Sequence, residues 1–300
     1  MKISYSAPGR AGILGNPSDI YGGSVISCSV PVRNTCTVEE ADDWVLPDDT
    51  RLWDAAVARI PLSGKYQVTW QTDVPRSSGL SGSTALLAST VACVLTVAGK
   101  DLADDPREVA ELVRDIELND AGIVCGYQDA YMIVHGGMRY LNFSGKHPID
   151  SGPLGRVKDV RMPGHFLLIT TGVERLSGSV HGPMRDRWLN GEKAVIDAME
   201  ELADMTDQAK NGLSINDLGH MMNRNFEIVQ ELGGSGESVD ALVKHCIENG
   251  AVAAKLAGAG MGGTVVALTD DPEDLQQRLA KIGYTKFLRP IADEGLRKEA

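Results

Sequence analysis

The chain has 300 residues, 43% of them hydrophobic, which is enough material for one large domain or two of ordinary size. Its formal net charge of −12 at pH 7 disfavours nucleic acid and anionic membranes as partners, because both need a basic footprint. Five scattered cysteines without paired metal spacing, and an N-terminus without the pattern of a secretion signal, predict a cytoplasmic protein.

In the first half of the chain, some segments alternate at period two and others carry apolar residues at helical spacing. The former predict strands at residues 3–7, 24–30, 35–39, 66–71 and 138–143, with 24–30 and 35–39 paired to each other. The latter predict helices at residues 52–59, 85–98, 106–119 and 127–135. Residues 8–23 are too glycine-rich for a helix, and residues 85–98 predict a buried helix too short to span a bilayer.

The second half begins after a turn-rich stretch, and we place the boundary so that the domains are residues 1–155 and 156–300. Strands are expected at residues 165–171, 251–256, 264–268 and 285–290. Helices are expected at residues 183–190, 192–208, 215–232, 238–249 and 272–282. Strands and helices alternate without a strict βαβ rhythm, which predicts an α+β fold in two lobes.

The segment at residues 75–86, Pro-Arg-Ser-Ser-Gly-Leu-Ser-Gly-Ser-Thr-Ala-Leu, joins a predicted strand to the buried helix. Its glycines let the backbone approach a ligand closely, and the first helical turn has N–H groups without internal partners. Such a loop predicts an anion site, with phosphate as the usual occupant. The alternative is an ordinary strand-to-helix loop in which a serine caps the helix.

A second glycine-rich segment, residues 257–263, contains the pattern G-x-G-x-x-G, which in dinucleotide-binding proteins stands between a strand and a helix. The residues that follow, Thr-Val-Val-Ala-Leu, are mostly β-branched and apolar and predict a strand instead. This order argues against a dinucleotide-dependent oxidoreductase. No G-x-x-x-x-G-K-[ST] sequence occurs in the chain, which excludes the ordinary P-loop.

Two carboxylates, Glu117 and Asp129, stand at the end of one predicted helix and at the start of the next. Taken singly, Glu117 is an ordinary solvated carboxylate and Asp129 a helix-start residue favoured by the helix dipole. A phosphoryl-transfer site needs an oxygen ligand for a metal, a phosphate cradle and a carboxylate that receives the acceptor's proton. The chain supplies one of each.

Three glycine-rich segments in this order, residues 8–23, 75–85 and 255–264, resemble the three motifs of the GHMP kinases. The first has the form Pro-Gly-Arg…Leu-Gly…Asp…Gly-Gly seen in the sugar kinases of that family. The resemblance covers essentially the whole chain. It implies an N-terminal lobe like ribosomal protein S5 domain 2, a ferredoxin-like C-terminal lobe, ATP as phosphoryl donor, and Mg²⁺.

The resemblance also implies roles for single residues. Asp129 matches the catalytic aspartate, and Arg10 takes the place of the basic residue that orients it. Ser83 matches the serine that meets Mg²⁺, Glu117 has the spacing of the Mg²⁺-binding glutamate, and Asp19 matches a ligand of a sugar hydroxyl. The implied phosphate cradle is Ser78, Gly79, Leu80, Ser81, Gly82, Ser83 and Thr84. The glycines implied to hold the third loop against the site are Gly258, Gly260 and Gly262.

Departures from the family pattern bear on the substrate. Asn16-Pro17 stands where galactokinases carry Glu-His, which argues against galactose. The second motif is Leu-Ser-Gly-Ser-Thr rather than Leu-Gly-Ser-Ser-Ala, and it keeps Ser83. Residues 14–19, 122–129 and 177–189 resemble the glucuronokinase branch, whose product is glucuronic acid 1-phosphate. We expect Asn16 and Gly260 to contact the substrate.

A uronate carboxylate needs a cation, preferably the bidentate fork of an arginine. Arg185 and Arg187, which follow a polar loop, are therefore candidate ligands, and the alternative is a pair of surface arginines on a helix. We expect ATP-dependent phosphorylation of the anomeric hydroxyl of a sugar or sugar acid, glucuronate first, by a monomer or homodimer. Another GHMP kinase acting on a different sugar, a polyol or a mevalonate-type acid is an alternative, and so is a non-catalytic sugar- and ATP-binding relative.

Overall fold

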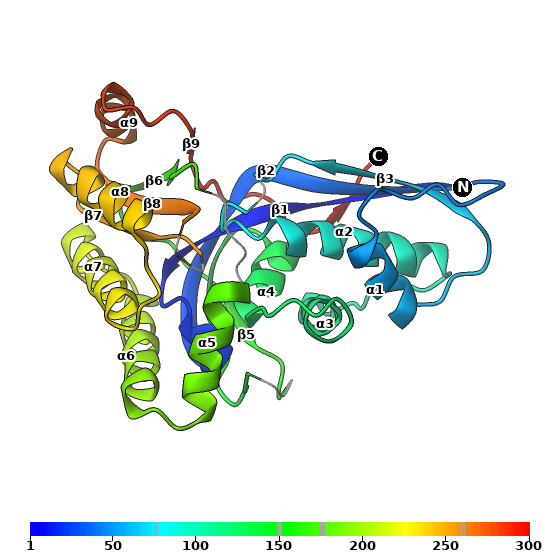
Figure 1. Cartoon of the computed structure of the whole chain (residues 1–300), viewed down its shortest axis with the longest axis horizontal. Helices are drawn as coiled ribbons and strands as arrows, with labels where there is room; N and C mark the ends of the chain where they lie inside the picture. Colours follow the sequence, from blue (N-terminus) through cyan, green and yellow to red (C-terminus); the bar gives the residue numbers. More distant parts are fainter. Residues whose placement is uncertain (76, 149–151, 174–177, 259, 261) are drawn as a thin grey trace.

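The computed structural model describes residues 1–300 apart from 76, 149–151, 174–177, 259 and 261. The chain forms two lobes side by side, each built from an antiparallel sheet and helices (Figure 1). In the described part of the chain, no helix is long and apolar enough to cross a membrane. The expected two-lobed α+β fold is confirmed.

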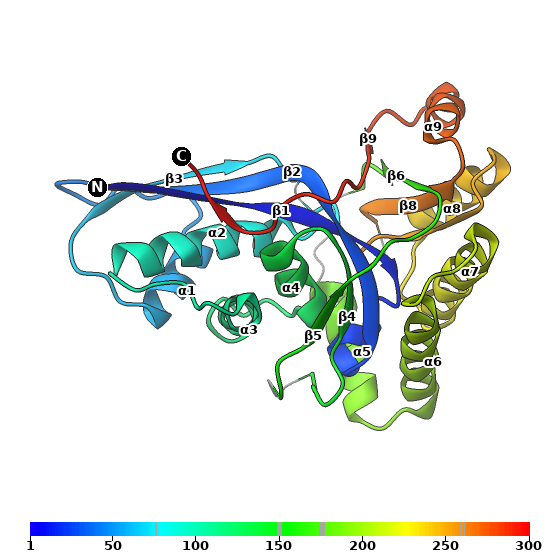
Figure 2. The same cartoon turned by 180° about the vertical axis from the view of Figure 1, so that it is seen from behind.

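In the first lobe, the helices lie on one side of a six-stranded sheet (Figures 1 and 2). The sheet has the order β10-β1-β2-β4-β5, and β3 pairs with the far half of β2. Its strands are β1 (Lys2–Leu14), β2 (Ser24–Glu40), β3 (Tyr66–Thr72), β4 (Met138–Asn142), β5 (Arg156–Asp159) and β10 (Arg297–Lys298). The helices are α1 (Arg51–Arg59), α2 (Gly82–Val97), α3 (Pro106–Asp115) and α4 (Tyr127–His135).

Strands β1 and β2 form one long antiparallel pair, so the expectations here need correction. The short strand expected at 3–7 continues to Leu14, and the two paired strands expected at 24–30 and 35–39 are one strand. The register shifts between Pro8 and Arg10, so the interruption in the sequence pattern is a β-bulge rather than a turn. Gly9 is required at this bulge, because a Cβ there would lie 2.8 Å from the carbonyl oxygen of Leu80.

The amphipathic helix expected at 106–119 ends earlier than its pattern indicated. Helix α3 stops at Asp115, and a π-helical turn, Ile116–Asp120, follows it. The apolar residues of α3 face the core, and the wider turn brings the Glu117 side chain into the core as well, where the residue is 1% exposed. Single π-helical turns are frequent at functional sites.

The second lobe has a four-stranded sheet with the order β7-β8-β6-β9. Its strands are β6 (His165–Thr170), β7 (Ala253–Leu256), β8 (Thr264–Thr269) and β9 (Phe287–Leu288). Its helices are α5 (Gly178–Leu189), α6 (Lys193–Ala209), α7 (Ile215–Glu231), α8 (Glu237–Glu248) and α9 (Pro272–Lys281). The expected elements are present, although β9 is only two residues long and α5 begins before the expected residue 183.

A shared apolar core joins the lobes, because Ile13 and Ile26 of the long strand pair belong to the same cluster as Met222 and Leu268 of the second lobe. The C-terminal segment returns to the first lobe, where β10 pairs with β1 and the Leu296 N–H donates to Val134 O (Figure 2). Strand β5, which follows the expected boundary at residue 155, also belongs to the first sheet. The division into domains at that residue stays a prediction.

Candidate active site

The loop between β3 and α2 has a backbone shaped for a ligand. Ser77, Gly79 and Ser81 all have positive φ angles, of 51°, 75° and 60°, which two serines adopt only at a cost in conformational energy. Ser81 precedes α2, but its side chain makes no capping hydrogen bond. The alternative of a serine-capped helix is therefore wrong, and the first N–H groups of α2 receive no hydrogen bond acceptor from this serine.

The third glycine-rich loop packs directly on the first residues of this loop. A Cβ on Gly258 would collide with the carbonyl group of Gly79, and one on Gly263 would lie 2.6 Å from Ser78 O. Only glycine permits two backbones to approach so closely. Gly260, with φ of 94°, packs against the backbone of Gly234 in the same way. Residues 78–79 thus form one layered structure with Gly258 and Gly263.

Arg10 connects this layered structure to Asp129. Its Nε lies 2.7 Å and its Nη2 2.6 Å from Asp129 Oδ1, while Nη1 donates to Gly79 O at 2.7 Å and to Ala257 O at 3.1 Å. The Arg10 backbone N–H also donates to Leu80 O at 3.0 Å. Arg10 is 5% exposed, and a buried guanidinium is tolerated only when such partners surround it. Arg10 therefore fixes β1, the loop between β3 and α2, the third glycine-rich loop and the Asp129 carboxylate relative to one another.

Asp129 lies in the first turn of α4, where the helix dipole favours a carboxylate. Asp19 lies in a 3₁₀ turn, Ser18–Tyr21, and its Oδ2 accepts from the Gln128 N–H at 2.9 Å, beside Asp129. Burial raises the pKa of Asp19 to about 6; the Gln128 N–H opposes the rise and the charge of Asp129 adds to it. The structure thus brings both predicted carboxylates to one side of the Arg10 guanidinium.

Glu117 approaches the phosphate loop from the π-helical turn. Its Oε1 accepts from Ser83 Oγ at 3.1 Å, and Thr84 Oγ1 donates to both of its carboxylate oxygens at 2.9 and 2.8 Å. Burial raises the pKa of Glu117 to about 7, and the negative charge of Asp129 adds to the rise, against hydrogen bonds from Thr84 and Ser83. Asp129 has Arg10 as its cationic partner, whereas the hydrogen bonds from Ser83 and Thr84 to Glu117 come from neutral hydroxyls.

The donor set of Ser83 and Glu117 fits a magnesium ion. Both offer oxygen atoms, which Mg²⁺ prefers, and a carboxylate that is bound by neutral hydroxyls can still accept a cation. Within the described residues, no group of three or more His, Cys, Asp or Glu side chains could hold a metal ion. A cation here would therefore share the phosphate oxygens of a nucleotide, which is the usual arrangement for Mg²⁺.

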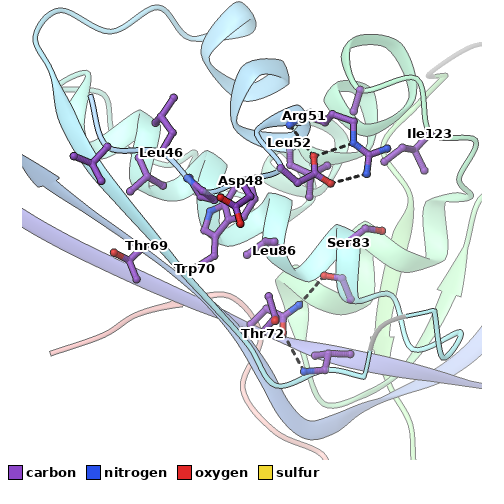
Figure 3. A pocket seen from close by; sticks show the side chains of 18 of the residues that line it. Leu46, Asp48, Arg51, Leu52, Thr69, Trp70, Thr72, Ser83, Leu86 and Ile123 are labelled. Atoms are coloured by element: carbon purple, nitrogen blue, oxygen red, sulfur yellow. Dashed lines mark hydrogen bonds and ion pairs between the residues drawn. The ribbon is translucent and has the colours of Figure 1, made fainter. Parts of the chain in front are cut away.

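A cavity of about 810 Å³ opens beside the phosphate loop and extends along β3 (Figure 3). Ser83 lies at one end, Trp70 and Thr69 of β3 line one wall, and Leu46 and Asp48 lie on the opposite segment. The volume falls in the range of small-molecule and cofactor sites. Trp44 and Trp53, the large apolar groups of the polar segment 41–65, lie outside the lining, and Trp53 is buried in the core.

On the other side of Asp129, Asn16 is held by the third glycine-rich segment. Its Oδ1 accepts from Lys255 Nζ at 2.6 Å, and its Nδ2 donates to Gly258 O at 3.3 Å. Lys255 is 0% exposed, and burial lowers its pKa to about 7, with the charge of Arg10 adding to the effect. Asn16 is thus bound within the protein, and its contact with a substrate stays a prediction.

The two arginines of α5 have different surroundings. Arg187 donates to both carboxylate oxygens of Glu192 at 2.8 and 2.6 Å and to Leu232 O at 2.9 Å. Arg185 has a buried Nε without a hydrogen bond partner among the described residues, and its Nη2 lies 3.6 Å from the exposed Asp186. Both guanidinium charges act on the hydroxyl of Tyr21.

Three residues of these surroundings were not predicted from the sequence: Trp70, Lys255 and Tyr21. Lys255 offered a signal, because it is the one charged residue in the apolar strand β7, where both faces are buried. Trp70 stands in a strand whose alternation was recognised, but the cavity that it lines depends on a distant segment. Tyr21 gave no local signal.

Comparisons with known proteins identify the family of the chain. Residues 51–137 match the GHMP kinases N terminal domain, and residues 199–285 match the GHMP kinases C terminal domain. A probable glucuronokinase 2 of Arabidopsis thaliana is 29% identical, over 92% of this chain and 87% of that protein. A D-glycero-alpha-D-manno-heptose 7-phosphate kinase of Campylobacter jejuni is 24% identical over 89% of each chain. The structure of Lactococcus lactis galactokinase with galactose superposes with a TM-score of 0.77, at 18% identity, over 99% of this chain and 95% of that one.

Proposed function

Because the chain belongs to the GHMP kinases, we propose that it is an ATP-dependent phosphotransferase that phosphorylates the anomeric hydroxyl of a sugar acid. Glucuronate is the first candidate for this sugar acid. Two observations support the choice of substrate. The chain is 29% and 26% identical to two A. thaliana proteins named as glucuronokinases. The helix α5 also carries arginines at the junction of the two lobes, beside the turn that holds Asp19 (Figure 1).

The observation that carries the proposed chemistry is the Arg10 side chain, which binds the Asp129 carboxylate and the Gly79 carbonyl at the same distance of 2.7 Å. Asp129 accepts the proton of the anomeric hydroxyl as that oxygen attacks the γ-phosphorus of ATP. The new oxygen–phosphorus bond forms while the bond to the β,γ-bridging oxygen breaks, and ADP leaves with that electron pair. Arg10 keeps the carboxylate in the orientation that receives the proton.

Phosphate binding falls to the loop at residues 78–84. The start of α2 has no side-chain cap from Ser81, and its backbone N–H groups would stabilise negative charge on the phosphates. Ser83 and Glu117 would hold Mg²⁺, which neutralises charge on the β- and γ-phosphates when it is bound. The nucleoside would occupy the cavity along β3 (Figure 3).

The test is ADP release with a panel of acceptors: glucuronate, galacturonate, glucose, galactose, a cyclic polyol and mevalonate. We expect the highest kcat/KM with a hexuronate, and a product whose phosphorus NMR signal is that of a sugar 1-phosphate. Highest activity with mevalonate or a polyol would overturn the substrate. The absence of ADP release with all acceptors would overturn the enzymatic reaction itself.

A further inference from the structure

The region around Trp188, at the C-terminal end of α5, contains several buried polar atoms without partners. The Trp188 ring lies 5.4 Å from the ring of Tyr21 and 5.0 Å from the ring of His147, measured between ring centroids. Among the described residues, Tyr21 Oη, His147 Nδ1 and Arg185 Nε have no hydrogen bond partner, although all three atoms are buried. Arg185 lies one helical turn before Trp188.

Unpartnered buried polar atoms are rare, because each leaves the cost of its desolvation without a compensating hydrogen bond. A hydroxyl, a guanidinium N–H and an imidazole nitrogen can all donate hydrogen bonds. Two of these atoms belong to rings that pack against Trp188, and the third belongs to Arg185, whose charge acts on Tyr21. A ligand that supplies acceptor oxygens would satisfy them. Since Arg185 contributes one positive charge and its ion-pair partner Asp186 is exposed to solvent, an anionic group fits best.

The cluster is positioned to contact a group of the acceptor that lies away from the phosphorylated hydroxyl. Tyr21 ends the 3₁₀ turn that carries Asp19, and Asp19 accepts from the residue next to Asp129. Burial raises the pKa of Tyr21; the carboxylate of Asp19 raises it further, and the guanidinium of Arg185 opposes the rise. Tyr21 therefore lies between helix α5 and the part of the site that contains Asp19 and Asp129.

We propose that Tyr21, His147 and Arg185 form a subsite that binds the carboxylate of the acceptor, which is carried on a different ring carbon from the phosphorylated hydroxyl. A single guanidinium matches the single charge of a carboxylate better than the double charge of a phosphate ester. Arg187 has no part in the subsite, because Glu192 and Leu232 O already satisfy its guanidinium. The inference rests on the proposed function, since it assumes that a sugar acid is the acceptor.

The experiment compares kcat/KM for glucuronate with kcat/KM for glucose, which has the same ring and a hydroxymethyl group in place of the carboxylate. In Arg185→Gln, we expect the value for glucuronate to fall about 10- to 100-fold, as the loss of a charged hydrogen bond entails, and the value for glucose to stay unchanged. Tyr21→Phe keeps the ring against Trp188 and should lower only the glucuronate value, about 5- to 10-fold.

Arg187→Gln is the matched control on the same helix. It should lower the melting temperature, because Glu192 and Leu232 O lose their partner, without changing the ratio of the two sugars. If wild-type enzyme prefers glucuronate and Arg185→Gln keeps that preference, the subsite is overturned while the proposed function stands. If wild-type enzyme uses no hexuronate, the proposed function fails. If wild-type enzyme instead prefers glucose 6-phosphate and Arg185→Gln abolishes that preference, the ligand of the subsite is a phosphate and the carboxylate is overturned.

Discussion

Arg10 and Arg185 illustrate two kinds of site within one molecule. Arg10 donates to Asp129, Gly79 O and Ala257 O, and its surroundings are complete without a ligand. Arg185 has a buried Nε with no partner among the described residues, and two further unpartnered atoms lie around the neighbouring Trp188. The groups to which we assign the chemistry are thus held in place in advance, whereas the groups to which we assign substrate choice lack partners among the described residues.

The difference has a physical basis. A catalytic carboxylate must keep its orientation in the transition state, and preorganised partners avoid a reorganisation cost at that moment. A selectivity site gains more if its hydrogen bonds form only with the correct acceptor, because a wrong acceptor then leaves buried polar groups unpaired. Substitutions near Arg10 should therefore change turnover for every acceptor, and those near Trp188 should change the ranking of acceptors.

The largest effect is expected for Asp129→Asn. The amide keeps the shape of the side chain and its contact with Arg10 but accepts no proton, so kcat should fall by about 10² to 10⁴ for glucuronate and glucose alike. The Kd for ATP, measured by calorimetry, should stay unchanged. Asp104→Asn, in an exposed loop, is the control. A normal kcat in Asp129→Asn would show that this residue is not the proton acceptor, and the region around Arg10 would then not be the catalytic one.

A smaller effect is expected for Ser83→Ala. The loss of its hydroxyl removes one oxygen and one hydrogen bond to Glu117, so the Mg²⁺ concentration for half-maximal activity should rise about 10-fold. The measurement is initial rate against Mg²⁺ at saturating ATP. Ser89→Ala removes a hydroxyl from the same helix, where it bonds only Leu86 O, and should leave the Mg²⁺ dependence unchanged. An identical Mg²⁺ dependence in Ser83→Ala would count against the role of this serine.

The smallest effect concerns Lys255, which supports the surroundings of Arg10 through its hydrogen bond to Asn16. Burial lowers its pKa from 10.5 to about 7, so between these values the unfolded chain binds more protons and stability falls as the pH falls. The free energy of unfolding of wild-type protein minus that of Lys255→Met should therefore shrink by on the order of 1 kcal/mol per pH unit from pH 9 to pH 7. Urea titrations at both pH values measure it.

The exposed Lys244→Met is the control for that measurement, since its amine is in solvent and should give no such trend. A constant difference between wild type and Lys255→Met across this pH range would mean that Lys255 keeps its charge when buried. The surroundings of Arg10 would then contain a second cation, Lys255, whose charge has no compensating partner there within the part of the chain that the structure describes.

Local patterns in the sequence were sufficient for most elements of the fold. The helix Tyr127–His135 was predicted with its observed bounds, because its glycine ends and apolar spacing are local features. The interruption within Ser24–Glu40 was misjudged, because a β-bulge and a turn both break the alternation and only pairing with β1 distinguishes them. The loop between β3 and α2 was singled out from its glycines and serines, and its binding of phosphate stays a prediction.

What the sequence by itself determined is therefore the order of elements, the three glycine-rich segments and the residue types that the chemistry requires. The meeting of Arg10 with Asp129, 119 residues apart, was implied by the family resemblance, and the tertiary structure shows it. Only the tertiary structure revealed that Asn16 meets Lys255, 239 residues away. It also separated Arg185 from Arg187, which stand two positions apart on one helix, because a neighbouring glutamate satisfies only one of them. Residue spacing encodes local periodicity, but long-range pairing depends on how whole surfaces pack, and no short stretch of the chain contains that information.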